Sequence, residues 1–218
     1  GGQVALTGRS GLDRLSSWVP GDLDLWVIQR EELSPLGYAE LWIRDGGTTP
    51  RDAAFTPLLT AWLDDFTARG VTAVGFGYIL VRRPAADGVP LRRLERVTQP
   101  VSNVGAALRA GLAAHDVLAT GLPATLLVAP DVTEARHLLP GNDDPSIIEL
   151  RQGGGFARTI TVDPALAGFV GACDGDLTVV QIVSALADLF EVPLVELWAD
   201  LEPRIRQLVL DGLLVPGE

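Results

Sequence analysis

Two long apolar runs in the N-terminal half constrain the fold more than any other feature of the sequence. Residues 23–30 (LDLWVIQR) and 71–83 (VTAVGFGYILVRR) are rich in β-branched and aromatic side chains and are bounded by Pro, Gly or charge. Such runs are typical of strands that are covered on both faces, as in α/β proteins. Gly75 and Gly77 interrupt the second run, which indicates a bulge or a close approach of two backbones there.

Two helices are predicted between these strands. Ser34 suits the N-cap of the first helix, Pro35 its first position and Gly46 its end. Thr49-Pro50 predicts the start of the second helix in the same way, and Gly70 predicts its end. This second helix has one apolar face, formed at helical spacing by Phe55, Leu58, Leu59, Trp62, Leu63 and Phe66.

The N-terminal residues predict a further strand. Gly1-Gly2 leads into an apolar run over 3–7, which we interpret as a short buried strand, and 11–19 predicts one or two helical turns. The chain contains no methionine. We therefore expect it to be the back part of a larger protein, in which strand 3–7 finds parallel neighbours instead of forming an open edge.

The C-terminal half predicts a mixture of helices and strands. A Pro- and Gly-bearing link at 84–90 is the expected boundary between a domain over 1–90 and an α+β extension over 91–218. Residues 153–155 are three glycines that join two strands as a hairpin, and 130–145 is predicted to be a loop. The other elements predicted here are helices over 103–119, 164–172, 178–190 and 194–211, and strands over 124–129, 146–151, 156–162 and 213–215.

Charge limits the partners of the second half. The net charge is −11, and residues 101–218 hold 6 Arg against 16 acids, whereas residues 1–100 hold 11 Arg against 12 acids. A protein that follows phosphates needs the opposite sign, so nucleic acid is a possible partner that the acidic half disfavours. The single cysteine, the absence of a leader pattern and the lack of an apolar run of about 18 residues predict a cytoplasmic protein with no membrane partner.

Few side chains carry chemistry on their own. His115 and His137 have no carboxylates at metal-ligand spacing, which favours structural or surface roles and predicts no metal site. Cys173 follows an apolar helix and has acidic neighbours, which favours a buried, unreactive thiol. Asp174 and Asp176 resemble half of a calcium loop, but the closing Glu is absent, which favours turn and cap chemistry before a helix that starts at Thr178.

Residues 1–83 resemble the C-terminal half of a Rossmann-type methyltransferase that depends on S-adenosylmethionine. In that fold the fifth strand follows a Gly-Gly turn, as in residues 1–6, and a sixth and seventh strand pair antiparallel at the sheet edge, which LDLWVIQRE and VGFGYILVRR fit. Residues 34–69 would be a helical insertion between them. The stretches 38–47 and 151–187 are similar to the methyltransferase small-domain group, in an actinobacterial branch with a C-terminal extension.

The resemblance implies a parent enzyme that transfers a methyl group to a nitrogen of a protein or nucleic-acid substrate. This chain lacks the family's Gly-rich cofactor loop and its Asn/Asp-Pro-Pro-Tyr motif. Asp143-Asp144-Pro145 has neither the second Pro nor the aromatic residue, and GGGF at 153–156 suits a hairpin better than a phosphate loop. We therefore expect no catalytic residue, no cofactor-binding residue and no bound S-adenosylmethionine in this chain alone, with the upstream half as its partner.

Residues 146–218 have a resemblance of their own, to winged-helix peptide-recognition modules of the PqqD kind. The turn Cys173-Asp174-Gly175-Asp176, the helix from Thr178 and the end Gly212-Leu213-Leu214 carry it. Modules of that kind pair a sheet edge with an extended peptide. Here strand 156–162 would be that edge. A winged helix that binds DNA would place basic residues on its recognition helix, but 194–211 carries a net charge of −2.

Two surfaces are candidates for substrate or partner contact. One is the short helix 38–45, and its competing interpretation packs Leu41 and Trp42 inward while the charged residues are solvated or paired. The other is an arginine cluster around 82–96, whose competing interpretation is pairing across a domain seam with acids of the second half. The sequence thus leaves two functions open, a methyltransferase part that closes a sheet edge and selects substrate, or a noncatalytic module that binds peptides by strand addition. The candidate residues are Tyr38, Glu40, Trp42, Arg44, Asp45, Arg82 and Arg83.

Overall fold

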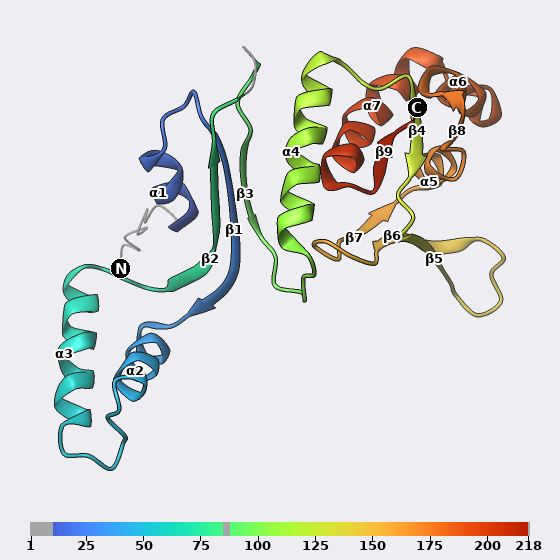
Figure 1. The fold of residues 1–218 in the computed structure, drawn as a ribbon. Coiled ribbons are helices and arrows are strands. Elements are labelled where there is room, and N and C mark those ends of the chain that lie inside the picture. The colour runs from blue at the N-terminus through green and yellow to red at the C-terminus, as the bar shows by residue number, and fades with distance from the viewer. Residues whose placement is uncertain (1–10, 85–87, 218) are drawn as a thin grey trace, which may run out of the picture. The chain divides into compact units, whose positions relative to one another are not determined.

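The computed structural model describes residues 11–84 and 88–217, which form a mixed α/β protein. This described part holds seven helices and three three-stranded sheets (Figure 1). The chain divides into two compact units, Gly1–Thr98 and Gln99–Glu218. The predicted strand over 3–7 lies outside the described residues.

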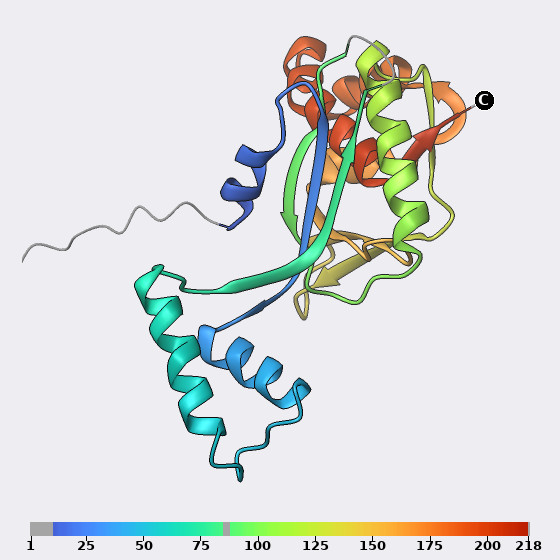
Figure 2. The same cartoon turned by 60° about the vertical axis from the view of Figure 1, so that its left-hand side comes forward.

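The first unit is built on a sheet with the strand order β2-β1-β3, as Figures 1 and 2 show. Strand β1 (Asp24–Leu33) pairs antiparallel with β2 (Val74–Arg82) and parallel with β3 (Arg92–Arg96). The antiparallel pairing predicted for the two apolar runs is therefore confirmed. Five consecutive residues of β1, from Asp24 to Ile28, are buried, as a strand covered on both faces requires.

Glycine permits the close approach of β2 to β1. A Cβ atom added to Gly77 would lie 1.9 Å from the carbonyl oxygen of Ile28, a separation that no side chain can occupy. The register of the ladder shifts between Gln29 and Glu31, directly beside this contact. The predicted bulge and close backbone approach are therefore both present, and Gly77 is the residue that the contact demands.

Two helices connect β1 to β2 and lie beyond one end of these strands (Figures 1 and 2). Helix α2 (Pro35–Asp45) begins as predicted, because Oγ of Ser34 accepts a hydrogen bond from the Gly37 N–H at 3.1 Å. Helix α3 (Phe55–Ala68) begins later than predicted. Oδ2 of Asp52 accepts from the Thr49 N–H at 2.7 Å, so that residues 49–54 form turns instead of helix. A short helix α1 (Gly11–Trp18) precedes β1.

The second unit contains two sheets and four helices among its described residues. One sheet has the order β8-β4-β9 and the other the order β5-β6-β7, and both are antiparallel. The strands are β4 (Thr125–Val128), β5 (Val132–Leu138), β6 (Pro145–Gln152), β7 (Thr159–Val162), β8 (Asp174–Thr178) and β9 (Leu214–Pro216). The helices are α4 (Val104–Thr120), α5 (Pro164–Gly171), α6 (Val179–Phe190) and α7 (Leu194–Asp211).

The core of the second unit lies among α5, α6, α7 and the adjoining strands. Phe169, Val183, Leu201 and Ile205 are among its most deeply buried side chains. Thr178 and the N3 residue Gln181 form a reciprocal capping box at the start of α6. Gly212 ends α7 with φ of +77°, as predicted for a helix stop.

Three strands differ from the sequence prediction. Strand β3 lies in the predicted α+β extension but pairs with β1, so the division of the chain falls after Thr98 instead of at residue 90. Most of the loop predicted over 130–145 is in fact strand β5. The prediction missed this strand because its polar side chains obscure the alternating apolar pattern. The predicted turn at Asp174 is part of β8, although Oδ1 of Asp174 does accept from the Asp176 N–H at 3.0 Å.

Strand β4 forms the middle of the C-terminal sheet, so this sheet extends beyond the predicted unit over 146–218.

Candidate functional site

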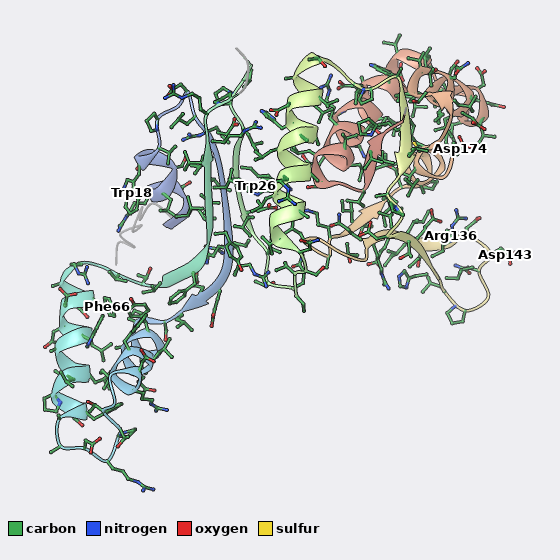
Figure 3. The ribbon with its side chains drawn as sticks, viewed as in Figure 1. Trp18, Trp26, Phe66, Arg136, Asp143 and Asp174 are labelled. Carbon is green, nitrogen blue, oxygen red and sulfur yellow. The ribbon has the colours of Figure 1, made fainter. Side chains whose placement is uncertain are left out.

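Tyr38 lies at the centre of an aromatic cluster in the helical insertion. Its ring centroid lies between 5.7 and 6.0 Å from four others, and the Phe76 ring stacks on it with an interplanar angle of 28°. The cluster joins α2, α3 and the start of β2, and Figure 3 labels one of its members, Phe66. Aromatic pairs at these separations stabilise the packing beyond their buried area. The members are Tyr38, Trp42, Trp62, Phe66 and Phe76.

The competing interpretation of α2 is wrong about which side chains face inward. Ala39 and Ile43 are the buried residues of α2, and their i, i+4 spacing places them on one stripe. Leu41 and Trp42 lie to the side of that stripe and are 49% and 45% exposed. The insertion therefore presents a large aromatic and a large aliphatic side chain to solvent.

The charged residues of α2 are at the surface. Nη2 of Arg44 lies 3.4 Å from Oε2 of Glu40, an exposed i, i+4 pair that contributes about 0.5 kcal/mol at most. Asp45 is exposed at the last position of the helix. The prediction that these charged residues are paired or solvated is therefore confirmed. Charged side chains also lie beside the exposed Trp42 ring on this helix.

Arg82 is engaged by a buried acid. Its Nε donates to Oδ2 of Asp24 at 2.6 Å, and the side chain of Asp24 has no exposed surface. The other carboxylate oxygen of Asp24 accepts from the Leu91 N–H at 2.7 Å. Arg82 therefore ties β2 to β1 and to the segment before β3. Arg83 is exposed and makes no ion pair with the residues that the structure describes.

The two groups of predicted site residues do not meet. Tyr38 packs on Phe76, near the start of β2, whereas Arg82 is the last residue of that strand. Arg82 lies six positions after Phe76 along the strand, which corresponds to about 20 Å. The helix α2 and the arginines at the end of β2 are thus two separate surfaces instead of one site.

Arg92 of the predicted arginine cluster donates hydrogen bonds to backbone carbonyl oxygens. Its Nη2 donates to the carbonyl oxygen of Ser16 at 2.9 Å, and its Nη1 donates to that of Pro20 at 3.0 Å. These bonds fix the end of α1 and the turn that precedes β1. Because backbone carbonyl oxygens already occupy N–H donors of this guanidinium group, fewer donors remain to bind a phosphate.

Two more arginines of the cluster contact acids of the same unit. Arg93 lies with its guanidinium carbon 4.9 Å from the Trp26 ring centroid, and its Nε lies 3.2 Å from Oε1 of Glu95. The indole Nε1 of Trp26 donates to the same oxygen at 2.6 Å. Arg96 lies 3.5 Å from Glu32. Arg82, Arg93 and Arg96 therefore pair with acids, but these acids belong to the first unit instead of the acidic second half that the sequence predicted. Strands of one sheet supply them.

Strand β2 exposes an unusual amount of apolar surface. Tyr78, Ile79 and Val81 are each about half exposed, at 48%, 56% and 48%. Ile79 and Val81 are two residues apart and lie on the same face of the strand. Among the described residues β2 pairs with β1 alone, so its other edge carries no strand there.

The reactive side chains of the second unit are engaged in ordinary structural contacts. Burial, and to a lesser degree the charge of Asp174, raises the pKa of the Cys173 thiol to about 12, so it stays protonated. Nε2 of His137 lies 3.0 Å from Oε2 of Glu149 on the surface of the β5–β6 hairpin. Among the described residues no group of three or more His, Cys, Asp or Glu side chains is placed to hold a metal ion.

The glycine-rich hairpin between β6 and β7 is closed by an acid. The N–H of Gly154 donates to Oδ2 of Asp131 at 2.8 Å, and the N–H of Gly153 donates to the Asp131 carbonyl oxygen at 2.8 Å. A carboxylate in contact with these amides opposes the binding of a phosphate group. The hairpin interpretation of this GGGF stretch is confirmed.

Strand β7 is an edge strand of its sheet. It pairs with β6 on one side, and its sequence Thr-Ile-Thr-Val has no charged residue. Strand β5, at the opposite edge, carries Glu134, Arg136 and His137. Charged side chains on an edge strand oppose pairing with another chain, so β7 is the more receptive edge.

No helix in the described part of the chain is both long and apolar enough to span a bilayer. Neither a scan against protein-family models nor a search of curated proteins finds a match to the chain.

Proposed function

We propose that the first unit is the edge of the catalytic sheet of an S-adenosylmethionine-dependent, Rossmann-type methyltransferase. The cofactor pocket and the chemistry belong to sequence upstream of β1. The substrate is a nitrogen of a protein or nucleic acid, and the acidic charge of residues 101–218 favours a protein. In this proposal the present chain supplies no catalytic residue.

The proposal is supported chiefly by the pairing of β2 and by the apolar side chains that it exposes. It runs antiparallel to β1, as the last two strands of that fold do, and exposes Ile79 and Val81 on one face. An apolar strand in an α/β sheet is covered by further strands and helices, because its faces and its edge are otherwise open to water. The upstream half of a methyltransferase sheet is the cover that fits a strand of this composition.

The helical insertion would then select the substrate. Helix α2 projects beyond the strands and exposes Leu41 and Trp42, and the Tyr38 ring packs against Trp42. Exposed aromatic residues on a rigid support are typical anchors of protein interfaces. Asp45 and Arg83, both exposed, would add polar contacts at two separate places on the unit.

A charge placed on β2 tests this function. We would measure transfer of a radiolabelled methyl group in a protein that extends upstream of residue 1, with Ile79→Lys and Leu58→Lys variants. Ile79 is 56% exposed on β2, and Leu58 is 42% exposed on α3. Loss of transfer in Ile79→Lys alone is expected, because a lysine there opposes burial of the strand. Equal activity of both variants would contradict the proposal.

A second function is supported by the edge strand β7. An uncharged, β-branched edge suits pairing with an extended peptide, and this is the noncatalytic alternative. Replacing Thr161, an exposed residue of β7, with proline would remove a backbone donor, so peptide binding by this edge would be lost. The same replacement at Glu134, which pairs with Leu150 on the opposite edge strand β5, is the control. Methyl transfer without any peptide binding would favour the first function.

A further inference from the structure

The turn that joins α6 to α7 carries an exposed apolar surface, which we call the corner patch. It comprises five large apolar side chains within seven residues: Leu189, Phe190, Val192, Leu194 and Val195. Leu189 and Val195 are 72% and 79% exposed, so they project into solvent instead of lining a groove. Contiguous exposed apolar side chains with polar neighbours are typical of protein interaction sites.

The core of the unit does not need the corner patch. The inward faces of the two helices are already complete, with Leu186 and Ala187 buried on α6 and Leu201 buried on α7. The turn itself is closed by backbone bonds, since the Val192 N–H donates to the Ala187 carbonyl oxygen at 3.0 Å. Packing within the unit therefore does not account for Leu189 and Val195, which are 72% and 79% exposed, whereas Phe190, Val192 and Leu194 are partly buried beside them.

The charge around the corner patch has a single sign. Residues 159–203 contain eight acids and no Arg or Lys. Three of these acids, Asp188, Glu191 and Glu196, lie within or beside the patch, and each is exposed without an ion pair in the described structure. Acids that Arg204 and Arg206 neutralise lie further along α7, at Asp200 and Glu202.

We propose that the corner patch binds a basic amphipathic helix of a partner protein. Such a helix presents an apolar stripe with arginine or lysine along its sides. The stripe would cover Leu189, Phe190 and Val195, and the flanking cations would meet Asp188, Glu191 and Glu196. Complementary charge of this kind selects the partner and accelerates its association. This interaction is independent of the function proposed for the first unit.

The test is fluorescence anisotropy with the full chain and a labelled helical peptide that has leucine on one face and arginine on the other. Two matched probes have glutamate in place of arginine, or serine in place of leucine. We expect saturable binding of the first probe only. Val195→Ser should weaken it roughly tenfold, as expected for loss of one buried side chain. Combined Asp188→Asn, Glu191→Gln and Glu196→Gln should weaken it and reduce its dependence on salt.

Val180→Ser is the control, because Val180 is 57% exposed at the start of α6, at the opposite end of that helix from the corner patch. Circular dichroism would establish that each variant is folded. Equal binding of the arginine and glutamate probes, or an equal effect of Val180→Ser and Val195→Ser, would overturn the proposal. A dimer in sedimentation that Val195→Ser dissociates would also overturn it, because a second copy of the chain would then be the occupant.

Discussion

Nε of Arg82 lies 2.6 Å from Oδ2 of Asp24, the one polar or charged residue classed as buried within the described parts of the chain. The pair crosses from the end of β2 to the start of β1, and the second oxygen of Asp24 binds the Leu91 N–H. This carboxylate thus links three consecutive parts of the first sheet.

Replacing Asp24 with alanine should lower the free energy of unfolding by about 3 kcal/mol, because it removes a buried carboxylate that accepts from both a mostly buried guanidinium group and a backbone N–H. Urea unfolding followed by circular dichroism measures this. Asp22→Ala, an exposed neighbour, is the control and should change stability by less than about 0.5 kcal/mol. Similar losses in both variants would contradict the structural role of Asp24.

Replacing Gly77 with alanine should destabilise the first unit by about 3 kcal/mol, since the new Cβ would overlap the Ile28 carbonyl oxygen. Gly75→Ala is a close comparison on the same strand. Its Cβ would meet only the flexible Gln29 side chain, at 3.3 Å, and the cost should be below about 1 kcal/mol. The denaturation midpoints of the two variants would show the difference, and a reversed order would refute the close strand contact.

Removing the Tyr38 ring should cost more stability than removing the Trp42 ring. Tyr38 contacts four other rings, so Tyr38→Ala should lower the free energy of unfolding by about 2 kcal/mol. Trp42 is 45% exposed, and Trp42→Ala should cost less than about 1 kcal/mol. Under the proposed function, Trp42→Ala should nevertheless impair binding of the methyl acceptor. Thermal unfolding and substrate affinity, measured on both variants, separate these effects.

Asp163 should make the second unit less stable in acid. Burial opposes its charged form, but the hydrogen bond from the Leu166 N–H and the contact with Arg204 together lower its pKa below 3.8. The stabilisation is therefore complete above about pH 4 and is lost as the pH falls through the lowered pKa of the folded state. Urea midpoints between pH 5 and pH 2 would fall less in Asp163→Asn, which retains the cap at α5. An identical decline in both proteins would exclude Asp163 as the titrating group.

Local sequence chemistry predicted much of the fold. Apolar runs identified β1 and β2, and caps such as Ser34 and Thr178 marked the starts of α2 and α6, because these signals act within a few residues. Strand β3 was missed because four of its five residues are Arg or Glu, and β5 because Glu134, Arg136 and His137 interrupt its apolar pattern. Their pairing with apolar strands elsewhere in the chain decides their structure, and a local pattern does not contain that information.

The candidate site was predicted less well than the fold. Helix α2 does expose Trp42, but Arg82 is bound to an acid that lies far away in sequence, and no local signal indicated Asp24 as its partner. The aromatic stripe of α3 was visible in the sequence, whereas the packing of Phe66 and Phe76 on the same Tyr38 ring depends on the path of β2. The corner patch, in turn, was hidden because exposed and buried apolar residues look alike in a helical pattern.

The most direct test of the central claim is isothermal titration of S-adenosylmethionine into this chain and into a protein that extends upstream of residue 1. The claim predicts no heat of binding for residues 1–218 and saturable binding for the extended protein, because the cofactor pocket lies outside this chain. Saturable binding by residues 1–218 alone, or none by the extended protein, would contradict it.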